Sequence, residues 1–162
     1  MVILHKSMVR GPIMRILVDA DACPVKQTIE TVASALGIQV IWVASIEHNI
    51  HSQYGQVIMV DHAPEAADLF IINHIMPGDI VVTQDLGLAS LVLAKGAQPI
   101  SPSGRVWHEE GMEILLYQRY INKKARQQGY HIGKTAARNN QDDQRFKQAL
   151  LDLINAGYSQ NN

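Results

Sequence analysis

Residues 16–24 read Ile-Leu-Val-Asp-Ala-Asp-Ala-Cys-Pro, and this stretch sets the pattern for the whole chain. Its three apolar residues predict a short buried strand that ends at Asp19. Pro24 follows where its fixed φ suits the first turn of a helix, and apolar residues then recur at helical spacing up to Leu36. Gly37 is typical of a residue that ends a helix. The stretch therefore predicts a strand, two carboxylates and a helix, in that order.

The same order of elements repeats along the rest of the chain. Further strands are predicted at residues 38–43, 57–60, 80–83 and near 99–100, and further helices from Pro64 through Ile71 and at residues 86–95, 109–128 and 142–155. The strands are rich in Val and Ile without polar alternation, which is typical of a parallel sheet buried on both faces. We predict an α/β fold with three layers, in which helices flank a mostly parallel, Rossmann-like central sheet.

The length and composition indicate one globular domain. The chain has 162 residues, 47% of them hydrophobic, and a mean hydropathy of -0.03. We expect an N-terminal extension at residues 1–13, a single domain at 14–156 and a flexible tail at 157–162. Polar residues interrupt every apolar run before the roughly 20 residues that a membrane-spanning helix needs, which excludes a membrane protein. The single cysteine, Cys23, fits a reducing compartment, and we expect the protein in the cytoplasm.

Acidic residues follow the predicted strands closely. Asp19 and Asp21 come after the first strand, Asp61 after the third and Asp85 after the fourth. If the first and fourth strands are neighbours, Asp19, Asp21 and Asp85 converge at the carboxyl edge of the sheet, where ligands of α/β proteins bind. Grouped carboxylates repel one another, and a hard cation such as Mg²⁺ or Mn²⁺ relieves that repulsion. The alternative is that Asp19 and Asp85 only cap the helices that follow them.

Three ordered blocks of sequence carry a family resemblance. They are residues 16–24, Ala66-Ala67-Asp68, and residues 78–89, which read Gly-Asp-Ile-Val-Val-Thr-Gln-Asp-Leu-Gly-Leu-Ala. The chain resembles the YaiI/YqxD family of uncharacterised bacterial proteins over about residues 14–155. The resemblance implies a PIN-like nuclease fold whose acidic cluster binds Mg²⁺ or Mn²⁺ and cleaves RNA. Carried over to this chain, the acidic positions are Asp19, Asp21, Asp68 and Asp85.

The two halves of the chain differ in charge. Residues 1–93 hold 4 basic and 9 acidic side chains, a net -5, whereas residues 94–162 hold 10 and 6, a net +4. Eight of the basic residues lie between positions 117 and 147: Arg119, Lys123, Lys124, Arg126, Lys134, Arg138, Arg145 and Lys147. Such a strip can bind a nucleic-acid backbone, with Tyr117, Tyr120 and Tyr130 available for base stacking. It is equally compatible with an ordinary solvated helix face.

These observations favour a metal-dependent phosphodiesterase that acts on RNA. Asp19, Asp21, Asp68 and Asp85 would hold the metal and water, and the candidate substrate contacts are Thr83, Lys123, Lys124, Arg126 and Lys134. One alternative is a phosphatase similar to the haloacid dehalogenases, in which Asp19 is phosphorylated, Asp21 is the general acid and Thr83 binds phosphate. A second alternative is an RNA-binding module without catalytic activity.

Overall fold

The computed structural model describes residues 13–21, 23–133 and 136–160. Its centre is a five-stranded parallel sheet in the order β3-β2-β1-β4-β5. The strands are β1 (Arg15–Asp19), β2 (Gln39–Ser45), β3 (Gln56–Val60), β4 (Ile80–Val82) and β5 (Gln98–Ile100). The helices are α1 (Lys26–Leu36), α2 (Ala66–His74), α3 (Leu86–Ala94), α4 (Met112–Gln127) and α5 (Asn140–Gln160). The predicted three-layer α/β arrangement is confirmed, and β1 and β4 are neighbours as expected.

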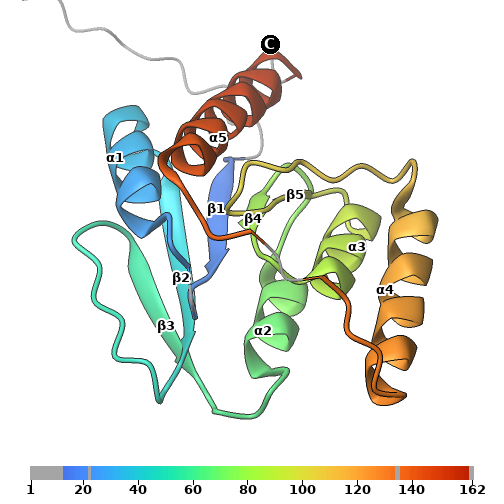
Figure 1. Ribbon diagram of the computed structural model, residues 1–162. Coiled ribbons are helices and arrows are strands. Elements are labelled where there is room, and N and C mark those ends of the chain that lie inside the picture. Colours follow the sequence, from blue (N-terminus) through green and yellow to red (C-terminus); the bar gives the residue numbers. More distant parts are fainter. Residues whose placement is uncertain (1–12, 22, 134–135, 161–162) are drawn as a thin grey trace, which may run out of the picture.

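Alternation along β1 separates the two cores of the protein. Ile16 and Val18 pack with residues of α1 and α5 on one face of the sheet, whereas Leu17 packs with residues of α2 and α3 on the other. Figure 1 shows these two helix pairs on opposite sides of the strands. Successive side chains of a strand point to opposite faces, so both faces of β1 are apolar when both are covered. The continuous Ile-Leu-Val run is the sequence signature of that double burial.

Helix α4 lies outside these three layers and packs on α3. Met112 and Trp107 are buried against Ala89 of α3, with Leu115 and Leu116 partly buried beside them. In Figure 1, α4 forms the outer edge of the molecule next to α3. The rest of its surface is therefore open to solvent. No helix in the described part of the chain is long and apolar enough to cross a membrane.

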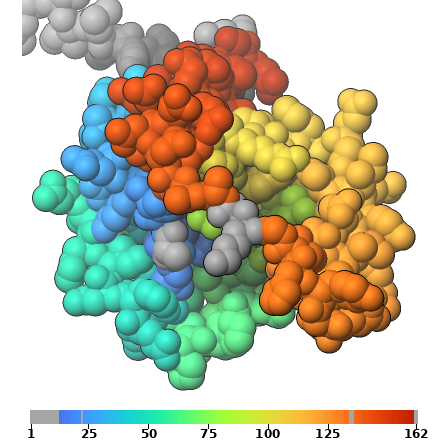
Figure 2. Space-filling model, in the orientation of Figure 1, coloured from blue at the N-terminus to red at the C-terminus, as the bar shows by residue number. Residues whose placement is uncertain are grey.

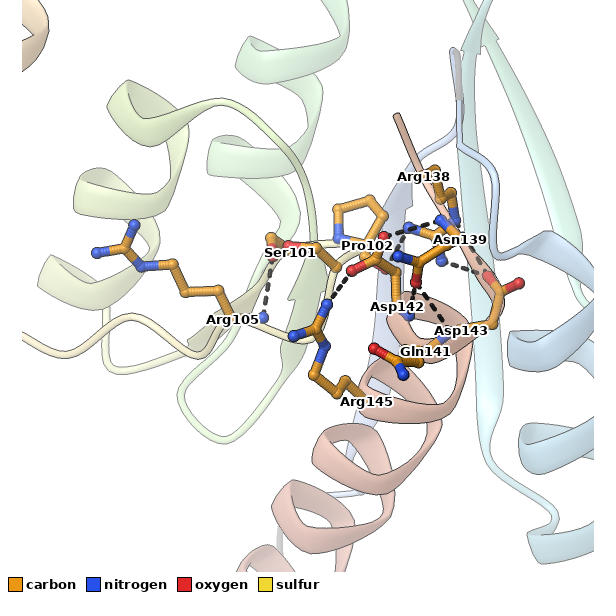
Figure 3. Close-up of polar contacts among 10 residues, drawn as sticks. Ser101, Pro102, Arg105, Arg138, Asn139, Gln141, Asp142, Asp143 and Arg145 are labelled. Carbon is orange, nitrogen blue, oxygen red and sulfur yellow. Dashed lines mark hydrogen bonds and ion pairs between the residues drawn. The ribbon is translucent and has the colours of Figure 1, made fainter. Parts of the chain in front are cut away.

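Helix α5 begins two residues earlier than predicted and ends five residues later. Asn139 precedes the helix, and its side-chain oxygen accepts hydrogen bonds from the backbone N–H groups of Gln141 (3.0 Å) and Asp142 (3.1 Å). The Asp142 carboxylate accepts in return from the N–H of Asn139 at 3.0 Å (Figure 3). This reciprocal capping box sets the start of the helix at Asn140.

The far end of α5 packs against Met14, the residue that precedes β1. Gly157 lies so close to Met14 that an added Cβ would fall 2.0 Å from the Met14 Cε atom. Met14 itself is buried. Residues 157–160 therefore continue the helix, where a tail was predicted, because this contact holds the last turns of α5 against the core.

Candidate active site at the carboxyl edge of the sheet

Asp19 ends β1 on the face of the sheet that α2 and α3 cover. It follows Leu17 by two positions, and residues two apart in a strand share a face. Val18 pairs with Val82 of β4, so the register carries Thr83 alongside Asp19. The Thr83 hydroxyl donates a hydrogen bond to Oδ2 of Asp19 at 3.3 Å. Sheet register thus fixes the position of the first candidate carboxylate.

The four predicted acidic residues influence one another electrostatically at this edge. The pKa of Asp19 is raised from 3.8 to about 6, mainly because burial removes water from the carboxylate and then because Asp68 is near. Asp21 and Asp85 also raise this pKa, and only the hydrogen bond from Thr83 lowers it. Asp68, Asp21 and Asp85 are thus near enough to Asp19 for their charges to raise its pKa. The consequence is a carboxyl group that resists ionisation.

Asp85 both caps α3 and faces the acidic edge. Its Oδ1 atom accepts a hydrogen bond from the Leu88 N–H at 2.9 Å, which is the N-cap interaction considered from the sequence. The same Oδ1 lies 3.5 Å from Nη1 of Arg119 on α4. The backbone N–H of Asp85 donates to the Thr83 hydroxyl at 3.0 Å. Thr83 therefore joins Asp19 and Asp85 through one hydroxyl group.

Asp68 lies in the first turn of α2. Burial raises its pKa first, followed by the negative charges of Asp85 and Glu65, while the positive charge of Arg119 opposes the rise. Arg119 thus acts on two of the acidic residues, although it was singled out in the sequence only as one member of the basic strip.

Asp21 has different partners from the other three. Both of its carboxylate oxygens accept from the backbone N–H of Ser45 at 3.1 Å, and Nδ1 of His48 lies 3.3 Å away. These contacts tie the end of β1 to the end of β2. The partners lie 24 and 27 positions further along the chain, so no local sequence pattern pointed to them. Asp61 is exposed at the end of β3, two strands from β1.

A groove about 660 Å³ in volume runs beside this edge, between the start of α3 and α4. It is lined by Gln84, Asp85, Leu86, Leu115, Gln118, Arg119, Asn122, Lys123 and Arg126, and we call it the α3–α4 groove. Arg119, Lys123 and Arg126 are spaced four and three residues apart, which places them on one face of α4. Figure 2 shows α4 in yellow-orange along the edge of the molecule. Asp85 therefore connects the groove to the acidic edge.

The remaining predicted substrate contacts lie elsewhere or outside the described residues. Thr83 is buried, with 1% exposed surface, and its hydroxyl is engaged with the two aspartates. The ammonium group of Lys124 lies 5.0 Å from the ring centre of Tyr120. Lys134 falls at positions 134–135, outside the described residues. Lys123 and Arg126 are thus the two predicted contacts that line the groove.

The donor chemistry of the edge fits a hard divalent cation. Carboxylate oxygens are the ligands that Mg²⁺ and Mn²⁺ prefer, and the pKa of Asp19 is raised first by burial and then by its acidic neighbours. Within residues 13–21, 23–133 and 136–160, however, no three His, Cys, Asp or Glu side chains lie close enough together to hold a metal ion. The residues therefore have the donor atoms that such a cation prefers, but no three of those in the described ranges are gathered at one point.

The fold and the site define the class of protein: a doubly wound α/β protein with acidic side chains at the carboxyl edge of its sheet. Residues 17–156 match the family described as "Uncharacterized BCR, YaiI/YqxD family", and the chain belongs to that family. A UPF0178 protein from Clostridium kluyveri is 42% identical over 87% of this chain and 93% of its own length. A UPF0178 protein from Natranaerobius thermophilus is 43% identical over 87% and 96%, respectively.

One solved structure shows a weak likeness to this chain. It is the crystal structure of a mutant of Rae1 (YacP) from Bacillus subtilis, with a TM-score of 0.42 and 19% sequence identity, covering 88% of this chain and 99% of that one. At this level the likeness supports no inference about activity.

Proposed function

We propose that the protein is a divalent-metal-dependent phosphodiesterase that cleaves RNA at the carboxyl edge of its sheet. One observation carries the proposal: a half-buried carboxyl group, Asp19, has a pKa raised to about 6 by burial and by three neighbouring acids, next to a groove lined by cations. Uncompensated carboxylates lower the stability of a fold, so they are expected where a positively charged ligand completes the site. The cationic side chains that line the groove suit the phosphates of a nucleic-acid backbone.

One or two of Asp19, Asp68 and Asp85 would hold the cation, because Mg²⁺ keeps several water molecules and is commonly bound through only one or two protein carboxylates. A Mg²⁺ or Mn²⁺ ion bound there would lower the pKa of a water molecule and offset the negative charge of the phosphate. Thr83 holds Asp19 and Asp85 in register with each other through its hydroxyl group. Asp21, held by Ser45 and His48, stays beside Asp19 and adds negative charge.

The reaction is the addition of water across a phosphodiester bond. The water oxygen gives up one proton and forms a new bond to phosphorus, the bond from phosphorus to the leaving oxygen breaks, and the leaving oxygen takes up one proton to become a hydroxyl group, so no net proton is gained or lost. Arg119, Lys123 and Arg126 would bind the phosphates on either side of the cut and orient the chain toward Asp85. None of these steps needs a nucleophilic side chain.

The proposed RNA substrate is single-stranded, because the basic face is narrow and lies on a single helix. One row of cations along α4 suits the backbone of a single strand, and exposed tyrosines on the same helix, Tyr117 and Tyr120, offer stacking surfaces for unpaired bases. Lys124 lies beside these stacking surfaces, because its ammonium group contacts the ring of Tyr120. We include Lys134 among the substrate contacts on the basis of sequence.

The test is a cleavage assay on labelled single-stranded RNA with Mn²⁺ or with a chelator. Wild type is expected to cleave with Mn²⁺ only, and Asp85→Asn is expected to be inactive. Asp61→Asn is the matched control, because Asp61 is an exposed carboxylate at a strand end two strands away. RNA that stays intact in every lane while still binding would instead support an RNA-binding module. Release of phosphate from small phosphomonoesters would support the phosphatase.

A further inference from the structure

Arg119 links the acidic edge to the α3–α4 groove. Its Nη1 atom lies 3.5 Å from Oδ1 of Asp85, and both side chains are partly exposed, at 52% and 38%. The same residue lines the groove together with Lys123 and Arg126. Among these three groove cations, Arg119 is the one that the structure pairs with an acidic residue. Its guanidinium group therefore lies beside the Asp85 carboxylate and also faces the groove.

The contact between Arg119 and Asp85 lies beside Gly87, where a side chain would crowd it. A Cβ atom at Gly87 would lie 2.9 Å from Nη1 of Arg119 and 3.0 Å from Oδ1 of Asp85. Gly87 lies within the first turn of α3, where alanine is otherwise the better helix former. The helix thus leaves space directly beneath the ion pair. An alanine at this position would therefore displace the Arg119 guanidinium group, which can move because it is the end of a flexible side chain.

The ion pair is of the kind that can exchange. Partly exposed pairs are held weakly, since water competes for both charges. A guanidinium group recognises phosphate with the same two-pronged geometry that it uses for carboxylate. Oδ1 of Asp85 also remains tied to the Leu88 N–H, so loss of Arg119 leaves the carboxylate anchored at the helix start. Arg119 can therefore leave Asp85 without releasing the N-cap of α3.

We propose that Arg119 alternates between two anions: it pairs with Asp85 in the free protein and transfers to a phosphate of RNA bound in the α3–α4 groove. The transfer frees Asp85 for the divalent cation, so RNA and cation each favour binding of the other. This inference rests on the proposed function, and it adds how substrate binding and the acidic site communicate. Arg119 is a substrate contact in the complex and a restraint on Asp85 in the free protein.

The first experiment measures RNA affinity without metal, by fluorescence anisotropy of a labelled single-stranded RNA in chelator. Gly87→Ala keeps every charge but pushes Arg119 off Asp85, so it is expected to bind RNA about two- to fivefold more tightly than wild type. Arg119→Gln is expected to bind more weakly. The double variant Gly87→Ala/Arg119→Gln is expected to bind no better than Arg119→Gln, because the gain depends on the freed guanidinium group.

The second experiment measures Mn²⁺ affinity without RNA, by calorimetry. Arg119→Gln is expected to bind Mn²⁺ about two- to fivefold more tightly than wild type, because the competitor for Asp85 is gone. Lys123→Gln removes an equal charge from the same groove and is expected to change Mn²⁺ affinity less.

The outcomes separate this inference from the proposed function. If wild type binds RNA and Mn²⁺, but Gly87→Ala and Arg119→Gln leave both affinities unchanged, the alternation of Arg119 is wrong and the phosphodiesterase proposal stands. If wild type binds neither RNA nor Mn²⁺, both are wrong.

Discussion

Two aspartates at opposite ends of the same pair of strands show how differently a carboxylate can be placed. Asp79 precedes β4 at the amino edge of the sheet and is 1% exposed. It accepts hydrogen bonds from the backbone N–H and guanidinium of Arg15 and from the N–H of Met76. Asp19 ends β1 at the carboxyl edge, where its neighbours are Asp68, Asp21 and Asp85.

The difference separates a structural acid from one that we propose to be functional. The charge of Asp79 is matched by Arg15, and its oxygens are satisfied, so its burial closes the amino edge of the sheet. The charge of Asp19 is opposed by its surroundings and is supported by one hydroxyl group. Burial alone therefore does not identify a site. In this protein, the signs of the neighbouring charges distinguish the two aspartates.

The largest expected effect is on the structural acid. Asp79→Asn leaves the Arg15 guanidinium, with only 15% of its side chain exposed, without its counter-charge. We expect the free energy of unfolding to fall by about 3 kcal/mol, measured by urea denaturation. The control Asp61→Asn should change it by no more than about 0.5 kcal/mol. A loss at Asp79 as small as the control's would mean that the amino edge is not held by this pair.

Asp19→Asn should have the opposite effect on stability and raise the free energy of unfolding at pH 7. The folded-state pKa of about 6 lies above the ordinary 3.8, so the contribution of Asp19 to stability is fully present below pH 3.8 and is lost as the pH rises through about 6. At pH 7 the substitution removes the cost of holding an ionised carboxylate at this site, and we expect the free energy of unfolding to rise by about 1–2 kcal/mol. Below pH 3.8 the gain should vanish. Equal effects at both pH values would show that Asp19 is not strained by its charge.

Thr83→Val tests the support that Asp19 does have. The change removes the hydroxyl group that donates to Asp19 and accepts from the Asp85 N–H. We expect a loss of about 1 kcal/mol in unfolding free energy. We also expect the pKa of Asp19 to rise further, as followed by ¹³C NMR of its carboxyl group. An unchanged pKa would mean that the hydroxyl group does not stabilise the ionised carboxylate.

Asp85→Asn should have the smallest effect on stability. Asparagine caps helices as well as aspartate does, so the unfolding free energy should change by less than about 0.5 kcal/mol, whereas Asp85→Ala should cost about 1 kcal/mol. RNA cleavage should be lost in both variants. Cleavage that survives in Asp85→Asn but not in Asp85→Ala would make Asp85 a cap only.

The sequence predicts this fold well because its strands are short, apolar and regularly followed by helices. Asp19 and Asp85 lie near each other because β1 and β4 are neighbours in the sheet, an order that the sequence pattern favours. Boundaries were less accurate, because the Asn139–Asp142 capping box and the contact of Gly157 with Met14 depend on local geometry.

The finer contacts of the site could not be predicted, because they join distant parts of the chain. Asp21 meets Ser45 and His48 only once β1 and β2 pair, and Arg119 meets Asp85 only once α4 packs on α3. The spacing of Arg119, Lys123 and Arg126 on one helical face was the available signal for the groove. It becomes informative once Asp85 is known to lie beside that face.

The most direct test of the account is the pKa of Asp19 measured by ¹³C NMR, with and without Mg²⁺. Without the cation the pKa should be about 6, and with Mg²⁺ it should fall below the ordinary value of 3.8, because the added positive charge favours the ionised carboxylate. A pKa that starts near 3.8, or one that Mg²⁺ leaves unchanged, would contradict a cation site built on Asp19.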